Sequence, residues 1–236
     1  MAKIVWDATG EKLYETGTKN GVLYPKDTNG QYGTGVPWNG LTAVTENPSG
    51  AEESKLYADD QKYLSLYSAE DFGCTIEAYT YPPEFAVCDG SVEIAPGVMA
   101  GQQSRRGFGF SYRTVVGNDQ QGEAYGYKLH LVYGATASPS EKSYATINDS
   151  PDAVTFSWEV TTTPENVPGF KPTAIITIDS TKADSDKLAE LEDILYGRDA
   201  VEADAQNNIE AVEAQEPRLP LPAEVIAKMK SATNNG

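Results

Sequence analysis

The side chains that could do chemistry in this chain are few and lie far apart. The single histidine, His130, would be the natural general base, but acid–base catalysis needs partners and the sequence marks none beside it. Asp59 and Asp60 could bind a metal ion, yet adjacent aspartates are also typical of an exposed turn, and the ligand spacing of a calcium loop is absent. Cys74 and Cys88 are too few for a disulfide framework and are interpreted as small buried hydrophobes made in a reducing cytoplasm. Phosphate loops, paired zinc cysteines, HExxH and nucleophile elbows are missing, so no catalytic, cofactor-binding or metal site is predicted.

Two further sets of side chains could recognise a partner. The 14 tyrosines, with Trp6, Trp38 and Trp158, could include a platform on which a sugar ring stacks. The alternative is packing in the core and at subunit interfaces, where aromatic side chains dominate the buried area. Arg105 and Arg106 form a basic doublet in an acidic chain, which fits either an ion pair with a partner or an exposed loop.

Composition limits the classes of protein that need be considered. A length of 236 residues allows one large all-β domain or two small domains. The formal charge of −17, from 35 acidic and 18 basic side chains, repels nucleic-acid phosphates and excludes sequence-independent binding to DNA or RNA. No apolar run is long enough for a bilayer and the N-terminus lacks a signal-peptide core, so we expect a soluble protein without a classical export signal.

Alternation of apolar and polar residues predicts the strands that would position these groups. Residues 128–133 and 153–160 both alternate with a period of two, which is typical of half-buried strands. Their inward residues are Leu129, Leu131, Tyr133, Val154, Phe156, Trp158 and Val160. Their outward residues, including His130, are polar apart from Val132, so we expect a sheet with one core face and one solvent face, which favours antiparallel pairing. Turn residues at 137–140 and 148–151 would isolate a short piece at 143–147.

The other expected elements are hairpins and short helices. Hairpins are predicted over residues 40–57, with a turn at 47–50, and over 61–80. Residues 58–60 are expected to form a hairpin tip from which residues 61–66 return. Further expected elements are a short helix at 82–88, a hairpin pairing 107–116 with 123–133, and a last strand at 173–178. Residues 1–35 are expected to form an arm or long loop containing one strand.

The C-terminal part is predicted to be helical and acidic. Residues 184–196 place leucines on one helical face, begin with aspartates and stop at Gly197, which predicts a flanking helix. Residues 198–217 carry acidic side chains with no basic partner after Arg198 and are interpreted as a solvated linker. The proline-rich stretch 218–222 should be extended. After it, Val225, Ile226 and Met229 form a small apolar face.

A series of motifs resembles the major tail, or tail tube, proteins of long-tailed (siphovirus-type) phages of Gram-positive bacteria. The motifs are KLYADD at 55–60, YPPE at 81–84, LHLVYGATASPSEK at 129–142, TINDSP at 146–151, FSWEV at 156–160, KPTA at 171–174 and LYG at 195–197. The resemblance covers about residues 36–197, and ordered matches are more specific than any single one.

The resemblance implies a mainly β, antiparallel β-sandwich of the tail-tube fold with one flanking α-helix and an acidic C-terminal extension. It divides the chain into an arm at 1–35, the tube domain at 36–197 and the extension at 198–236. It implies hexameric rings that stack into a conduit for DNA ejection, without specific DNA binding, enzyme activity or membrane contact. It also implies a tape measure protein in the lumen, distal tail and tail terminator proteins as partners, and a place in the virion after assembly in the host cytoplasm.

Within that picture, the hairpins at 40–57 and 61–80 are expected to line the lumen, and an acidic wall would keep DNA from sticking. The candidate lumen or rim acids are Glu46, Glu52, Glu53, Asp59, Asp60, Glu70, Asp71 and Glu77. The helix at 184–196 should lie on the outer face, and Val225, Ile226 and Met229 should dock on their own or an adjacent subunit. The acidic extension favours a non-contractile tail, because a sheath would need that surface. The alternative function is a carbohydrate-binding β-sandwich on a phage or cell surface.

Overall fold

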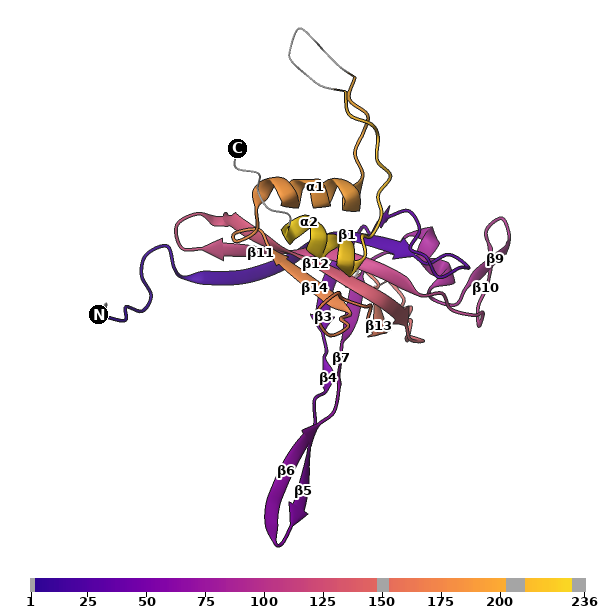
Figure 1. The fold of residues 1–236 in the computed structure, drawn as a ribbon. Coiled ribbons are helices and arrows are strands. Elements are labelled where there is room, and N and C mark those ends of the chain that lie inside the picture. Colours follow the sequence, from indigo (N-terminus) through magenta and orange to yellow (C-terminus); the bar gives the residue numbers. More distant parts are fainter. Residues whose placement is uncertain (1–2, 148–152, 203–210, 231–236) are drawn as a thin grey trace.

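The computed structural model describes residues 3–147, 153–202 and 211–230, and the fold is mainly antiparallel β, as predicted (Figure 1). The main sheet has the strand order β2-β1-β11-β12-β13-β8-β3, and β14 pairs with β12 beside this path. The strands of this sheet are β1 (Leu13–Pro25), β2 (Val36–Pro37), β3 (Leu41–Glu46), β8 (Gly73–Ala78), β11 (Phe108–Asn118), β12 (Gly122–Ala137), β13 (Phe156–Thr162) and β14 (Ile175–Asp179).

Strand β12 belongs to two ladders and so folds the sheet into two layers. Its middle pairs with β14, and its last residues pair with β13. Gly134 lies at the change of partner with φ of +58°, where a Cβ atom would come within 2.1 Å of the Thr163 carbonyl oxygen. Glycine is therefore required at this close approach. Beyond it, β13, β8 and β3 cover one face of the β1-β11-β12-β14 layer.

The core between the two layers is aromatic. Trp38 packs with ring centroids 5.6 Å from Trp158, 4.6 Å from Phe85 and 5.5 Å from Phe110. Phe85 comes from the short 3₁₀ helix η1 (Pro83–Val87), which begins with a proline as predicted. Edge-to-face contacts of this kind add stability beyond the area they bury.

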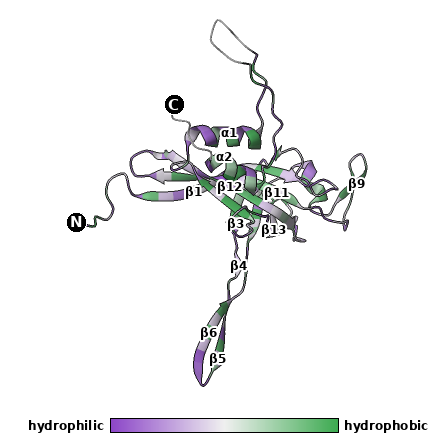
Figure 2. Ribbon diagram, in the orientation of Figure 1, coloured by the Kyte–Doolittle hydropathy of each residue, from purple (hydrophilic) through white to green (hydrophobic). Residues whose placement is uncertain are grey.

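The opposite face of the central strands is covered by two helices, α1 (Ser185–Tyr196) and α2 (Pro222–Lys230) (Figure 1). The predicted α1 is capped by Asp184, whose carboxylate accepts hydrogen bonds from the backbone of Asp186 and Lys187, and Gly197 follows its last residue. Figure 2 shows apolar segments concentrated where helices and sheets meet. The residues buried there include Tyr24, Leu129, Leu131, Tyr133, Leu188, Leu191, Leu195, Leu219 and Val225.

The expectation of one solvent face is therefore wrong for β12. Leu129, Leu131 and Tyr133 share a face as predicted, but His130 and Val132 on the other face are also buried. The second layer covers that side. Antiparallel pairing is confirmed, although the solvent face from which it was inferred does not exist there.

The two hairpins predicted at 40–57 and 61–80 are one long arm. Strand β3 pairs with β8, β4 (Ser49–Gly50) with β7 (Glu70–Asp71), and β5 (Glu53–Ala58) with β6 (Gln61–Tyr67). The expected reversal at 47–50 does not occur, because the chain continues outward through β4. The tip does lie at Asp59 and Asp60, which both have positive φ, as a tight hairpin turn requires.

The strand expected within residues 1–35 is β1, and it is more central than an arm would be. Its residues Val22, Leu23 and Tyr24 are buried, and it pairs with β11 along its length. The strand expected within this segment is confirmed, but the prediction of an arm or long loop does not hold for residues 13–25. Residues 3–12 leave the body as an arm (Figure 1).

The remaining segments agree in part with the predictions made from the sequence. The β11–β12 hairpin and the strand β14 are confirmed. Residues 143–147 form no strand, and the turn expected at 148–151 lies outside the described residues. A small unpredicted hairpin joins β9 (Val92–Ala95) to β10 (Val98–Ala100). The described ends of 198–217 run side by side through bridges rather than as a helix.

Candidate assembly surface

His130 is a structural residue of the core in the folded chain. Its ring stacks on Tyr112 at 4.5 Å, with Nε2 3.0 Å from Thr114 Oγ1 and Nδ1 3.3 Å from Thr177 Oγ1. Burial lowers its pKa, although the Glu46 carboxylate 3.5 Å away acts in the opposite direction. A ring held between two hydroxyls and an aromatic face is not exposed to a substrate.

The other chemistry-bearing side chains also lack a site. Cys74 and Cys88 are free and buried, and burial raises the pKa of each thiol to about 12. Asp59 and Asp60 lie at the exposed arm tip. Within residues 3–147, 153–202 and 211–230, no cluster of three or more histidine, cysteine or acidic side chains could hold a metal ion.

The arm ends in an amphipathic hairpin, β5–β6, which leaves the body without contacting it (Figure 1). Leu56 lies directly opposite Leu64 in the ladder, and Leu66 is two residues further along β6. Because side chains two residues apart point to the same side, these three leucines form one face. All three are exposed, Leu66 by 54%. We call Leu56, Leu64 and Leu66 the leucine face.

The opposite face of β5–β6 carries charged and hydroxyl-bearing side chains, with the exposed Tyr57 and Tyr67 beside them. Glu53 accepts hydrogen bonds from Lys62 Nζ at 2.6 Å and Ser65 Oγ at 2.5 Å, and Lys55 Nζ lies 3.5 Å away. The Lys62 and Ser65 hydrogen bonds keep the pKa of Glu53 below its usual value. This polar face is therefore suited to solvent, whereas the leucine face is not.

The outward surface of the second layer is polar and acidic. The register places Glu77 beside Ser157, and Thr75 beside Glu159 and Thr45. None of these five side chains is basic. Glu159 was expected to point outward but was not named as a wall residue, because only the register with β8 brings it beside Thr75 and near Glu77.

The predicted lumen acids do not form one group. Glu46 lies on the inward side of β3, where its carboxylate accepts a 2.7 Å hydrogen bond from the Tyr112 hydroxyl. Glu53 is paired with lysines, as described above. The others lie along the arm or on the second layer, and they are Glu52, Asp59, Asp60, Glu70, Asp71 and Glu77.

The C-terminal candidates contact the chain's own body. Val225 is buried and Met229 half-buried against the helix-side core, and Ile226 is half-buried beside them. Arg105 lies 3.5 Å from Asp89 in the same chain, whereas the side chain of Arg106 is exposed.

The aromatic residues divide between the core and the surface. Trp38 and Trp158 are core residues, while Trp6 and three tyrosines of the arm, Tyr57, Tyr63 and Tyr67, are exposed.

Besides the two-residue strand β2, two longer edge strands of the main sheet have no second partner strand within the described part of the chain. Strand β14 pairs only with β12, and β3 pairs only with β8. An unpaired edge presents a row of backbone N–H and C=O groups that another chain can use.

No protein-family model matches this chain, and no curated protein matches it in sequence. It is similar to a chain in the cryo-EM structure of the sheath–tube complex of an extracellular contractile injection system (PVC) in its extended state. That match has 10% identity and a TM-score of 0.36, and it covers 68% of this chain and 88% of the other. A second match is a chain of the anti-feeding prophage (AFP) baseplate, 6-fold symmetrised, with 8% identity, a TM-score of 0.36, and coverage of 76% and 99%. Likenesses of this size decide nothing about activity. In the described ranges, no helix has the length and apolarity needed to cross a bilayer.

Proposed function

We propose that this chain is a structural virion protein, the subunit of the tail tube of a long-tailed phage. Copies would form hexameric rings that stack into the conduit for DNA ejection. The proposal starts from the ordered motifs over residues 36–197. It is supported by an exposed apolar face and open sheet edges that a second copy could cover.

The observation that carries the proposal is the unpartnered leucine face of β5–β6. A two-stranded hairpin with a bare apolar face is at best marginally stable in water. Leu56, Leu64 and Leu66 are exposed, and no other helix or strand among the described residues packs extensively on the β5–β6 hairpin, so cover would come from a second copy. A neighbouring subunit would supply that cover in every copy of a repeating assembly.

The second layer supplies a suitable wall for a DNA conduit. Its outward side carries Glu77 and Glu159 among small polar residues. Like charge keeps phosphates from binding, so DNA would pass without being held. Acids along the arm, such as Glu70 and Asp71, would add charge at the wall or rims. The open edges of β3 and β14 would pair with neighbouring subunits around the ring.

The remaining roles follow from the same proposal. Helix α1 would face outward, and the acidic extension would suit an unsheathed, non-contractile tail. A tape measure protein would occupy the lumen, with distal tail and tail terminator proteins at the ends. The subunit would be assembled in the host cytoplasm and act in the virion, with no enzymatic role.

Electron microscopy of the purified protein tests the proposal. Rings or tubes with six-fold symmetry are expected. Monodisperse monomers that shift on addition of glycans would contradict it and support the carbohydrate-binding alternative, with the exposed tyrosines of the arm as the stacking surface.

A further inference from the structure

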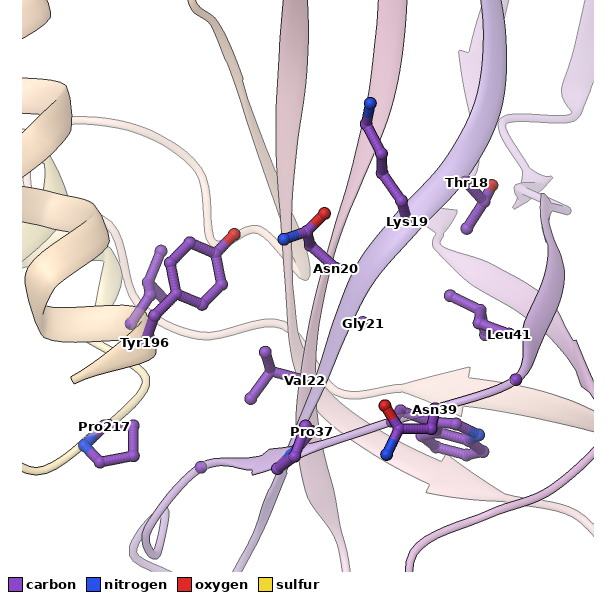
Figure 3. Close-up of a pocket in the computed structure, with 14 residues that line it drawn as sticks. Thr18, Lys19, Asn20, Gly21, Val22, Pro37, Asn39, Leu41, Tyr196 and Pro217 are labelled. Atoms are coloured by element: carbon purple, nitrogen blue, oxygen red, sulfur yellow. The ribbon is translucent and has the colours of Figure 1, made fainter.

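A groove of about 650 Å³ runs beside β1 (Figure 3). Tyr196 at the end of α1 and Pro217 form one wall, and Asn39 and Leu41 lie on the other side. Strand β2 pairs only with the inner end of β1, at Val22 and Leu23. The Gly21 carbonyl oxygen accepts a hydrogen bond from Trp38 N at 2.8 Å, so only the short stretch Thr18–Asn20 borders the groove with an edge that no strand of the described chain covers. The pairing of β1 with β11 is irregular on both sides of Lys19.

The groove has the chemistry of a short peptide site. Val22, Leu41 and Tyr196 make it largely apolar. The Lys19 side chain is exposed beside it, and no carboxylate of the described residues pairs with this lysine. An apolar pocket with one cation and a short open stretch of strand suits a short apolar segment that ends in a carboxylate.

The N-terminal arm contains such a segment. Ile4, Val5 and Trp6 are exposed by 69%, 67% and 76%, and Asp7 follows directly. Three consecutive apolar side chains at this exposure are typical of an interaction site. The aromatic side chain and the carboxylate match the pocket and the lysine of the groove.

The arm of the same chain is held away from its own groove. Gly10 N donates to Asp119 Oδ1 at 2.9 Å, and Asn118 Nδ2 donates to the Gly10 carbonyl oxygen at 3.3 Å. These bonds tie the root of the arm to the β11–β12 turn. From there the arm points away from the body, at the opposite end from the last turn of α1 (Figure 1).

We propose that residues 4–7 of one copy bind the groove of a second copy, with Trp6 in the apolar pocket and Asp7 paired with Lys19. This inference rests on the proposed function only in assuming that copies of the chain associate with one another. The contact joins two different surfaces, so it can repeat from copy to copy around a ring or along a helix.

Disulfide trapping tests the contact. A Trp6→Cys chain is mixed with an Asn39→Cys chain under mild oxidation, and linked peptides are identified by mass spectrometry. The native Cys74 and Cys88 are buried and do not compete. A Trp6–Asn39 link between copies is expected. The matched control replaces Asn39→Cys with Val98→Cys, which is 49% exposed on β10 and should link roughly tenfold less.

A charge exchange gives an independent measurement. Lys19→Glu should weaken self-association by about fivefold, because it places a second negative charge beside Asp7. Combining it with Asp7→Lys should restore association. A double variant as weak as the single one would overturn the pairing.

Three results of the trapping experiment would overturn the inference. The first is a yield of the Trp6–Val98 control link equal to that of the Trp6–Asn39 link. The second is a disulfide within one chain that carries both Trp6→Cys and Asn39→Cys. The third is a higher yield of linking between Asn39→Cys and Leu66→Cys of the arm hairpin. Tubes without the Trp6–Asn39 link would remove this inference and leave the tail tube proposal standing. A Trp6–Asn39 link in assemblies that form no rings would support this inference and contradict the tail tube proposal.

Discussion

Strand β12 and the β5–β6 hairpin show the same alternation of leucines and polar residues, yet their environments are opposite. Leu129 and Leu131 of β12 are fully buried, and so is the neighbouring Val132 on the other face. Leu56 and Leu66 of the hairpin are exposed by 43% and 54%. A period of two therefore reports which side chains share a face and says nothing of what covers that face.

The cover of β12 comes from distant parts of the chain. Helix α1 lies more than fifty residues after Leu131 and covers one side, while β8 lies more than fifty residues before it and contributes to the other side. Among the described residues, no distant helix or strand packs extensively on the hairpin. An apolar strand face without a cover inside the chain is the structural reason to look for a second copy.

The largest expected effect is on the doubly covered strand. Leu131→Ala should lower the free energy of unfolding by about 2–5 kcal/mol, because it removes a fully buried side chain and leaves a cavity. Chemical denaturation of the subunit measures this. A loss below about 1 kcal/mol would contradict the contrast between the two regions, since Leu131 would then contribute no more than an exposed leucine of the hairpin.

A smaller effect is expected from weakening one of the two covers. The Asp184 carboxylate caps α1 by accepting hydrogen bonds from Asp186 N at 3.1 Å and Lys187 N at 3.2 Å. Asp184→Ala should cost about 1 kcal/mol in the free energy of unfolding. Thermal unfolding measures it, with Ser185→Ala as the matched control one residue away. An equal loss in both variants would exclude the cap as the cause.

A third prediction concerns pH on the other face of β12. Burial lowers the pKa of His130 below its ordinary 6.5, so the unfolded chain takes up a proton at higher pH than the folded one. The folded subunit should lose stability as pH falls below about 6.5. His130→Gln cannot titrate and should lose less between pH 7 and pH 5.

Denaturation of both proteins at the two pH values gives the comparison for His130. The groups facing its ring are Glu46, Tyr112, Thr114 and Thr177, with Lys128 and Glu15 as further charges that act on it. They are unchanged in the variant, so they contribute to both curves. Identical pH dependence would show that folding leaves the pKa of His130 unchanged.

Much of the fold could be predicted because it depends on local signals. Asp184 and Gly197 bound α1 as expected, and the proline start of η1 is where the sequence places it. The burial of His130 could not be predicted, since it depends on Glu46 and Tyr112 from other strands. For the same reason the hydrogen bond from the Tyr112 hydroxyl to the Glu46 carboxylate could not be predicted, and the lumen position of Glu46, whose side chain is 43% exposed, stays a prediction.

The arm shows where local signals mislead. Residues 47–50 have turn chemistry, Asn-Pro-Ser-Gly, and a chain reversal there would give two short hairpins. The actual partner of β3 is β8, so the reversal occurs only at Asp59 and Asp60. Alternation on either side of the turn fits both arrangements. Only long-range pairing selects one long arm and thereby moves the leucine face away from the body.

The smallest effect on subunit stability should accompany the largest effect on assembly. Replacing Leu56, Leu64 and Leu66 together by Ser should change the free energy of unfolding by no more than about 0.5 kcal/mol, because these side chains are already exposed to solvent. Assembly should be lost, since the surface that a neighbour would cover becomes polar. Sedimentation and electron microscopy measure assembly, and denaturation measures stability.

The matched control replaces Ile94, Val98 and Met99 on β9–β10, which are exposed by 69%, 49% and 51%, and should leave assembly intact. A large loss of stability in the leucine variant would reveal a cover inside the chain, and unchanged assembly would remove the arm from the subunit interface.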